Sequence, residues 1–229
     1  MPDPRERAVP IFGPKSNLIA KALFLGFFMG FTGLSLASWS LNRSPYLNLT
    51  GDYIQQPVPF SHAHHVGGLG LDCRYCHTSV EISSNAGFPS THTCMTCHSQ
   101  IWNHAPILAP IRQSYEKNRP IRWKRVYRLP DYVYFDHGIH IAKGVGCATC
   151  HGRMDRMPLS TPVQPFYMQQ CLACHNHPEN SLRPQEEIFN MEWSPPSNPN
   201  ERKRLGQELL MKYKIAPARR LTDCYVCHR

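Results

Sequence analysis

The stretch "PFSHAHHVGGLGLDCRYCH", residues 59–77, decides how this chain is interpreted. It contains four histidines and two cysteines, and His62, His64 and His65 fall within four residues. It ends in the pattern Cys-x-x-Cys-His, and every other cysteine of the chain lies in a copy of that pattern. The five copies, here called motifs 1 to 5, occupy residues 73–77, 94–98, 147–151, 171–175 and 224–228.

Cys-x-x-Cys-His is typical of c-type haem attachment, in which two thiols form thioether bonds to the porphyrin and the histidine becomes the proximal iron ligand. The sequence therefore predicts five covalently bound haems c. The attachment cysteines are Cys73, Cys76, Cys94, Cys97, Cys147, Cys150, Cys171, Cys174, Cys224 and Cys227. The proximal ligands are His77, His98, His151, His175 and His228.

Zinc and disulfides explain the pattern less well. Five Cys-x-x-Cys pairs cannot combine into four-cysteine zinc sites without one pair left over, and zinc does not require histidine directly after each pair. A disulfide framework has no use for those histidines. Haem c attachment also implies that the motifs lie on the periplasmic, or otherwise extracytoplasmic, side of a membrane.

The net charge of +9 would by itself suggest an anionic partner such as nucleic acid. Haem propionates give a better account, because five oxidised haems bring the total to about +4 and five reduced haems to about −1. Nucleic-acid binding is therefore not expected. A mean hydropathy of −0.41 with 21 prolines is poor material for an ordinary core. Five porphyrins supply large apolar faces, so a loop-rich fold of short helices around the haems is predicted.

The N-terminal region predicts a single membrane anchor. Residues 22–41 carry no charge and are long enough, as a helix, to cross a bilayer. The positively charged residues before them predict that the N-terminus stays in the cytoplasm. The alternative is a signal peptide cleaved near "SLAS", but the apolar run is longer than a usual signal core. We expect a cytoplasmic tail (residues 1–16), a transmembrane helix (17–43) and a periplasmic pentahaem domain (44–229) in a bacterial inner membrane.

An internal repeat organises the haem region. "FSHAHH" (60–65) precedes motifs 1 and 2, and "FDHGIH" (135–140) precedes motifs 3 and 4. Phenylalanine and first cysteine are 13 residues apart in one copy and 12 in the other. This similarity predicts a duplicated two-haem unit with a fifth haem added at the C-terminal end. Residues 105–134 are expected to form a spacer or arm, and residues 178–200 an extended, irregular one. Residues 200–214 are expected to form a short amphipathic helix with Leu205 and Leu209 on one face.

The repeated Phe-x-His-x-x-His element predicts distal iron ligands. Histidines three residues apart lie on one side of a helical turn, where two imidazoles are placed to reach two different irons. These four ligands are His62, His65, His137 and His140. Phe60 and Phe135 are expected to pack on porphyrin edges.

The fifth distal ligand stays open between several residues. His64 is the first candidate, and a methionine such as Met168 is the second. His92, His104 and His177 are the other histidines outside the motifs, and they are expected instead at the surface or near propionates. A dense basic run between residues 112 and 128 suits propionates or acidic partners, and equally a solvated face.

The chain resembles the pentahaem cytochrome c subunit of alternative complex III, a bacterial quinol oxidoreductase. The resemblance runs from about Pro59 to the C-terminal end, through "FSHAHHVGGLGLDCRYCHTSVE", "TCMTCHSQIW", "RVYRLPDYVYFDHGIHIAKGVGCATCHGR", "QPFYMQQCLACHNHPE" and "LTDCYVCHR". It implies a membrane complex with an iron–sulfur subunit like molybdopterin oxidoreductases, polytopic quinol-oxidising subunits and a monohaem cytochrome c. It also implies electrons from menaquinol, passed to a cytochrome c, a copper protein or a terminal oxidase.

Three functional classes can be compared on the residues. An electron-transfer subunit, which is not an enzyme on its own, needs haem irons with both axial positions filled. The chain has enough histidines to fill both positions on all five irons. A multihaem reductase acting on nitrite or hydroxylamine needs an open iron, often with lysine in place of the motif histidine, and no Cys-x-x-Cys-Lys occurs here. The nearer alternative is a membrane-anchored quinol dehydrogenase cytochrome that feeds a periplasmic reductase; the motifs quoted above favour alternative complex III.

Overall fold

A computed structural model describes residues 13–228 of the 229-residue chain. Most of the expected cytoplasmic tail, residues 1–12, lies outside the described residues. The chain divides into two compact units, the first ending at Asn48 and the second beginning at Leu49. Each unit is described by itself below.

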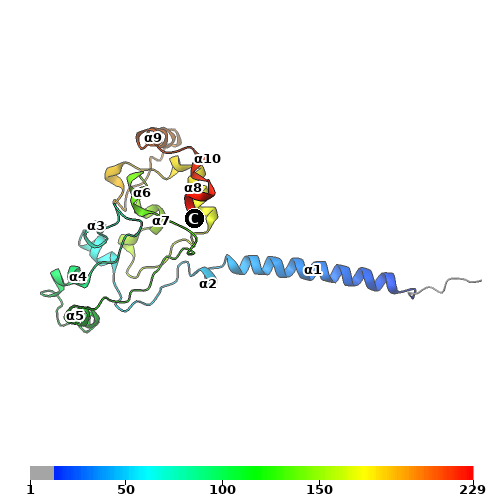
Figure 1. The fold of residues 1–229 in the computed structure, drawn as a ribbon, viewed down its shortest axis with the longest axis horizontal. Helices are drawn as coiled ribbons and strands as arrows, with labels where there is room; N and C mark the ends of the chain where they lie inside the picture. The colour runs from blue at the N-terminus through cyan, green and yellow to red at the C-terminus, as the bar shows by residue number, and fades with distance from the viewer. Residues whose placement is uncertain (1–12, 229) are drawn as a thin grey trace, which may run out of the picture. The chain divides into compact units, whose positions relative to one another are not determined.

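The first unit is built on α1 (Ser16–Asn42), followed by the single turn α2 (Pro45–Asn48). Figure 1 shows α1 as one continuous helix. An 18-residue stretch of it has a mean hydropathy of 1.7, and none of its residues is buried. Phe27 and Phe31 stack on one face of it, with ring centroids 6.3 Å apart. By length and composition the helix can cross a membrane, a test that a signal sequence near an N-terminus also passes. The expected helix over residues 17–43 is thus confirmed as a helix; its role as an anchor stays a prediction.

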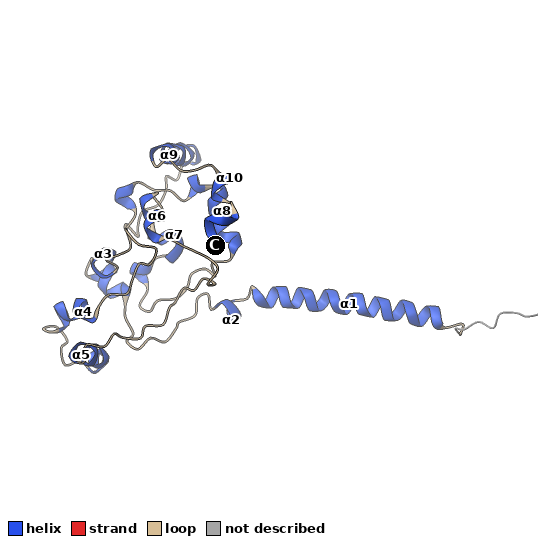
Figure 2. Ribbon diagram, viewed as in Figure 1, coloured by secondary structure: helices blue, strands red, loops and turns tan. Residues whose placement is uncertain are grey.

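The second unit consists of short helices joined by long loops (Figure 2). Its described residues contain isolated β-bridges, such as Val133 with His228, but no extended strand. The α-helices are α3 (Cys73–Cys76), α4 (Thr91–His98), α5 (Ala109–Glu116), α6 (His137–Ala142), α7 (Cys147–His151), α8 (Met168–Asn176), α9 (Pro199–Lys212), α10 (Ala218–Leu221) and α11 (Cys224–Cys227). A π-helical turn, η1 (Ala63–Gly68), and the 3₁₀ turns η2 (Pro106–Leu108), η3 (Met154–Arg156), η4 (Pro178–Asn180) and η5 (Gln185–Glu187) complete the set.

Each haem motif forms its own short helix, and side-chain caps begin three of these helices. Asp72 and Asp223 directly precede the first cysteine of α3 and α11, and each carboxylate accepts a hydrogen bond from a backbone N–H of the first turn. Ser90 caps α4 in the same way. Capping satisfies backbone donors that a helix start leaves unpaired. The local sequence therefore fixes where these motifs become helical.

The apolar core is small and divided into two clusters. One is formed by Val58, Leu108 and Ile111, and the other by Val80, Ile141 and Ile188. Motif cysteines pack at the edge of both, Cys94 on the first and Cys147 on the second. So little buried surface cannot hold together loops of this length, which supports the expectation that porphyrin faces supply much of the core.

Two expectations for the connecting segments have different outcomes. The amphipathic helix expected over residues 200–214 is confirmed as α9, with Leu209 4% exposed. Residues 105–134, expected to form a spacer or arm, contain α5, which packs beside α4 (Figure 1). Pro110 in its first turn and an apolar contact through Ile111 explain this helix, since proline is favoured at that position.

Candidate haem-binding sites

Three of the expected distal histidines face a motif histidine at nearly the same separation. The ring centroids of His65 and His98 are 6.2 Å apart. Those of His137 and His151 are 6.3 Å apart, and those of His140 and His175 are 6.2 Å apart. The rings of each pair are too far apart to be in contact, and the separation is nearly the same in all three pairs. This indicates that the same kind of atom or group fits between the two rings of each pair.

An iron ion fits between these rings. A metal bound at about 2 Å to one nitrogen of each imidazole places the two ring centroids about 6 Å apart. Thiols lie within the same motifs as His98, His151 and His175, as haem attachment requires. The arrangement of the described residues thus fits haem with two axial histidines at motifs 2, 3 and 4.

His62 belongs with motif 1. Burial, followed by the neighbouring rings of His77 and His65, lowers the pKa of His62 to about 4. His65 faces the histidine of motif 2. In the second repeat, His137 faces the first motif of its pair and His140 faces the second. We expect the first repeat to follow the same rule, with His62 opposite His77.

Hydrogen bonds to Nδ1 orient most of these rings. In seven cases the acceptor is a backbone carbonyl, which can only accept, so Nδ1 carries the proton and Nε2 keeps its lone pair for a metal. The seven are His65 to Ser61, His77 to Gly87, His98 to Ile101, His137 to Ser84, His140 to Asp136, His175 to Leu221 and His228 to Tyr132. His62 differs, because its Nδ1 lies 3.1 Å from the hydroxyl of Ser160.

The phenylalanine of each repeat packs on both histidines that follow it. Phe60 stacks on His65, with centroids 4.4 Å apart, and meets His62 edge-on at 4.9 Å. Phe135 does the same with His140 at 4.4 Å and His137 at 4.8 Å. These contacts restrict the planes of the imidazole rings. The expectation that Phe60 and Phe135 pack on porphyrin edges stays a prediction.

Burial shapes the electrostatics of the motifs. It raises the pKa of the Cys147 thiol to about 12 and that of Cys150 to about 11. It also lowers the pKa of His151 to about 4, with help from His137 and other rings. These groups are therefore neutral at physiological pH, because burial disfavours a charged thiolate or imidazolium at motif 3.

Successive contacts connect the motifs in a single order. Tyr75 of motif 1 and Thr96 of motif 2 share a hydrogen bond of 2.8 Å. Val80, just after motif 1, belongs to the apolar cluster on which Cys147 of motif 3 packs. Motifs 3 and 4 share the ligand helix α6, and α8 of motif 4 packs on α10, directly before motif 5. The order is 2–1–3–4–5.

The two end motifs are also the most open. Cys97 of motif 2 and Cys224 of motif 5 are exposed, while the other eight motif cysteines are half-buried. Figure 1 shows α4 at one end of this unit and α8 with α10 at the opposite end. Because the first and last sites of the series both lie near the protein surface, electrons could enter at one end and leave at the other.

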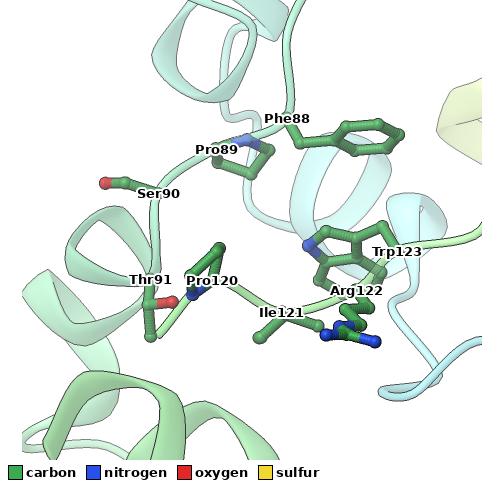
Figure 3. A pocket seen from close by; sticks show the side chains of 8 residues that line it. All are labelled: Phe88, Pro89, Ser90, Thr91, Pro120, Ile121, Arg122 and Trp123. Carbon is green, nitrogen blue, oxygen red and sulfur yellow. The ribbon is translucent and has the colours of Figure 1, made fainter. Parts of the chain in front are cut away.

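A pocket of about 490 Å³ adjoins motif 2 (Figure 3). Phe88, Ile121 and Trp123 supply its apolar wall, and Arg122 its charge. Trp123 and Ile121 also pack on the cluster that holds Cys94. The pocket therefore belongs to the surroundings of the motif-2 site.

Motif 5 differs from the others. Its histidine, His228, stacks on Tyr132 with centroids 5.8 Å apart, and no ring contact among the described residues joins it to another histidine. Met168, one of the two expected alternatives, begins α8, the helix that packs on α10. His64, the other alternative, stacks on Trp102 beside motif 2, at the far end of the series. The expectation that His64 is the fifth ligand stays a prediction, and its surroundings do not support it.

The remaining histidines have other neighbours. His92 packs edge-on against Tyr115, with centroids 4.8 Å apart. Nδ1 of His177 lies 3.4 Å from a carboxylate oxygen of Glu179. Among residues 13–228, no ring or ion-pair contact joins His104 to another side chain. The expectation that these three histidines lie at the surface or near propionates stays a prediction.

The alternatives to haem find no support in the described residues. All ten cysteines are free thiols, so no disulfide framework is present. Within residues 13–228, no group of three or more histidine, cysteine, aspartate or glutamate side chains is arranged to hold a bare metal ion such as zinc.

Comparison with known proteins agrees with this geometry. No family model matches the chain. Part of it is similar to the multihaem cytochrome c subunit of a menaquinone reductase from Nitratidesulfovibrio vulgaris (strain Hildenborough), with 37% identity over 103 residues. The match covers 44% of this chain and 48% of that protein, so the chain spans about half the length of its curated relative.

The similarity supports a multihaem cytochrome c with covalently bound haem, in agreement with the Cys-x-x-Cys-His motifs. The relative itself is, by its name, one subunit of a menaquinone reductase. The number of haems and the individual ligands rest on the motifs and ring pairs described above.

Proposed function

We propose that this chain is the pentahaem electron-transfer subunit of a membrane quinol oxidoreductase of the alternative complex III type. The observation that carries the proposal is the set of three histidine pairs with ring centroids 6.2–6.3 Å apart, each pair joining a repeat histidine to a haem motif. Haem c held in this way supplies reversible one-electron exchange at an iron whose axial positions are both filled. The chain's own residues would attach the haems, supply their iron ligands and hold neighbouring haems in position.

The order 2–1–3–4–5 gives the path. Each repeat supplies ligands to two neighbouring sites. His62 and His65, at the start of η1, would link motifs 1 and 2, and His137 and His140 of α6 would link motifs 3 and 4. Motif 2 and motif 5, whose Cys97 and Cys224 are exposed, are the ends at which electrons enter and leave. A cryo-EM map of the assembled protein tests this. A porphyrin of motif 1 that does not lie between those of motifs 2 and 3 would contradict the order.

Haem content and ligand binding test the electron-transfer role itself. We expect five haems per chain by the pyridine haemochrome assay, and a polypeptide heavier than its amino acids by five haem masses. Carbon monoxide should leave the reduced spectrum of the four sites with paired histidines unchanged. A response from two or more haems would instead support a reductase with open irons.

The fifth site has its own test. We propose Met168 as the distal ligand of the motif-5 iron, because α8 packs on α10. Met168→Leu should then open one haem to carbon monoxide, whereas Met211→Leu, at another exposed methionine, should not. An unchanged spectrum in Met168→Leu would exclude this residue and leave His64 or a partner subunit.

Quinol oxidation is assigned to partner subunits, and the proposed partners are those that the resemblance implies: an iron–sulfur subunit like molybdopterin oxidoreductases, polytopic subunits and a monohaem cytochrome c. We place α1 in the bacterial inner membrane and the haem unit in the periplasm. Co-purification of the chain with such subunits, together with menaquinol-dependent reduction of its haems, is the expected result.

The name of the relative favours a second candidate, in which electrons flow toward menaquinone instead. A quinol dehydrogenase cytochrome that feeds a periplasmic reductase is a third, suggested by the single apolar helix and the haem motifs. Purified protein can separate the three. Reduction by menaquinol only when the polytopic subunits are present supports alternative complex III, and reduction by menaquinol of the isolated chain supports the dehydrogenase. Oxidation of the pre-reduced complex by menaquinone, without the reverse reaction, supports the reductase.

A further inference from the structure

Arg183 is a charged side chain buried within the haem unit. It is 5% exposed, and it follows the bridge that joins Val145 to Leu182. Burying a cation costs free energy unless a negative group compensates it. Its surroundings therefore need an explanation.

The guanidinium is held in place by neutral groups. Nη1 donates to the carbonyls of Glu187 and Asn190, at 3.3 and 3.1 Å, and Nη2 lies 3.4 Å from the hydroxyl of Thr149. The ring of Trp193 covers it, with Cζ 4.7 Å from the ring centroid. Nε is buried without a hydrogen-bond acceptor. The side chain is thus fixed, and its charge is only partly satisfied.

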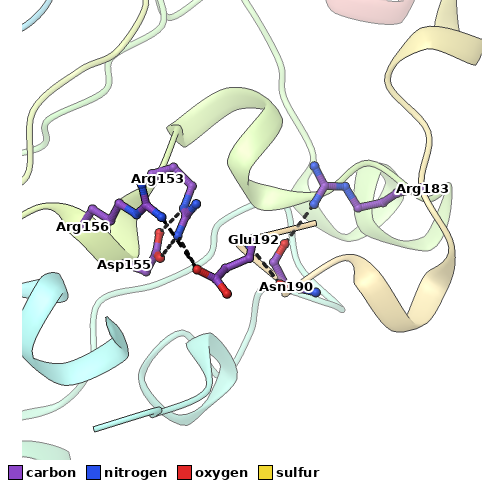
Figure 4. A network of polar contacts seen from close by, with 6 residues as sticks. All are labelled: Arg153, Asp155, Arg156, Arg183, Asn190 and Glu192. Atoms are coloured by element: carbon purple, nitrogen blue, oxygen red, sulfur yellow. Dashed lines mark hydrogen bonds and ion pairs between the residues drawn. The ribbon is translucent and has the colours of Figure 1, made fainter. Parts of the chain in front are cut away.

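No carboxylate forms an ion pair with Arg183 among the described residues. Figure 4 shows the contrast with Arg153, which pairs with both Asp155 and Glu192. The carboxylate of Glu187 accepts a hydrogen bond from Asn190 instead. Burial lowers the pKa of Arg183, the nearby Glu187 carboxylate acts in the opposite direction, and a guanidinium stays protonated at physiological pH. The chain therefore keeps a positive charge at this place that no carboxylate contacts directly among the described residues.

That place is the start of motif 3. A Cβ added to Gly146 would lie 2.1 Å from Nε and 2.2 Å from Cζ of Arg183, so the guanidinium packs directly on the residue before Cys147. Thr149, which accepts from Nη2, lies between the two cysteines of the same motif. Arg183 therefore contacts motif 3 on both sides of Cys147.

We propose that Arg183 raises the reduction potential of the haem attached at Cys147 and Cys150. The inference rests on the proposed function, because it requires haem at motif 3. A haem held at Cys147 and Cys150 would accept one electron from a neighbouring haem, and the site would become one unit less positive. A nearby fixed cation favours the less positive, reduced form, and a buried charge is screened little by solvent or salt. Arg183 would therefore make the motif-3 haem easier to reduce than it would be without this charge.

The test is a spectroelectrochemical titration of the haem-loaded, full-length protein. In Arg183→Gln, the reduction equilibrium of one haem should shift about tenfold toward the oxidised form, a midpoint lower by 59 mV for one electron. Arg183→Lys should restore most of that midpoint, since it keeps the charge. Arg156→Gln is the matched control, because Arg156 is a 68% exposed cation following the same motif, and it should leave all midpoints unchanged. His137→Met identifies which midpoint belongs to motif 3.

A second pair of variants keeps the packing of Arg183. Thr149 is exposed and its hydroxyl meets Nη2, so Thr149→Asp places a carboxylate against the guanidinium and should lower the same midpoint. Thr149→Asn adds a neutral side chain of equal size and should not. These variants decide the question if Arg183→Gln fails to assemble.

The outcomes separate this inference from the proposed function. A wild-type protein without haem at motif 3 overturns both. Five haems per chain with unchanged midpoints in Arg183→Gln and Thr149→Asp overturn the role of Arg183 alone. A shift shared by Arg183→Lys and Thr149→Asn would assign the effect to packing, and would also overturn it.

Discussion

The imidazole rings of His137 and His151 lie nearly parallel, with 11° between their planes and 6.3 Å between their centroids. Three residues further along α6, His140 faces His175 with 25° between planes. A helix of only six residues therefore aligns two motifs that are otherwise separate. The same arrangement in the first repeat differs in one respect, because His65 and His98 are inclined by 67°.

The ligand assignment predicts opposite results for two histidine variants. His140→Met should change the spectrum and raise the midpoint potential of one haem, because methionine stabilises ferrous iron relative to histidine. His64→Met, next to a proposed ligand but stacked on Trp102, should leave all five midpoints in place. A redox titration followed by visible absorption measures the midpoint potentials in both variants. A shift in His64→Met would return that residue to the ligand set.

The ring angles predict two kinds of low-spin EPR signal. Parallel imidazole planes split two iron d orbitals and give a rhombic spectrum, whereas steeply inclined planes leave those orbitals close in energy and give a strongly anisotropic one. We expect rhombic signals from motifs 3 and 4 and an anisotropic signal from motif 2. His98→Met should remove the anisotropic signal. Loss of a rhombic signal instead would contradict the inclination of that pair.

Phe135 should matter for ligand orientation more than for haem attachment. Phe135→Leu removes the ring that stacks on His140, a contact of about 0.5–1.5 kcal/mol beyond burial, so the EPR signals of motifs 3 and 4 should broaden or shift together. Haem content should stay at five. Phe88→Leu, at a 55% exposed ring that lines the pocket near motif 2, is the control. Unchanged EPR in Phe135→Leu would mean that the porphyrins orient the ligands by themselves.

Gly146→Ala should destabilise the haem unit. The new methyl group would lie 2.1 Å from Nε of the buried Arg183, and overpacking of this kind costs about 1–3 kcal/mol. Thermal unfolding followed by the haem spectrum should show a lower midpoint temperature. Gly68→Ala, where the nearest atom would be 3.7 Å away, should have a much smaller effect. Equal melting of the two variants would show that Arg183 can move aside.

The role of α1 can be tested by fractionation. The full chain should stay with the membrane after a salt wash, because a 27-residue helix containing an 18-residue stretch with a mean hydropathy of 1.7 is long and apolar enough to span a bilayer. Residues 44–229, exported behind a cleavable signal, should appear in the soluble periplasmic fraction with their haems. A soluble, shortened form of the full chain would instead indicate a removed signal peptide.

The sequence alone predicted the chemistry of the sites and their number. Cys-x-x-Cys-His is a local pattern, because both thioethers and the proximal ligand come from five consecutive residues. The capping residue Asp72 and the apolar run of α1 are local in the same sense, and the structure has a helix at each. The repeat also indicated that His137 and His140 act as a pair.

Only the tertiary structure decided which sites these histidines reach and in what order the sites stand. His140 and His175 are 35 residues apart in the chain, and the intervening spacing does not fix how the segments fold back on each other. The same holds for Arg183, one of 25 basic residues and unremarkable in sequence. Its burial arises where Gly146 and Trp193 from separate loops meet, because side-chain packing depends on contacts between segments and not on the order of residues within one.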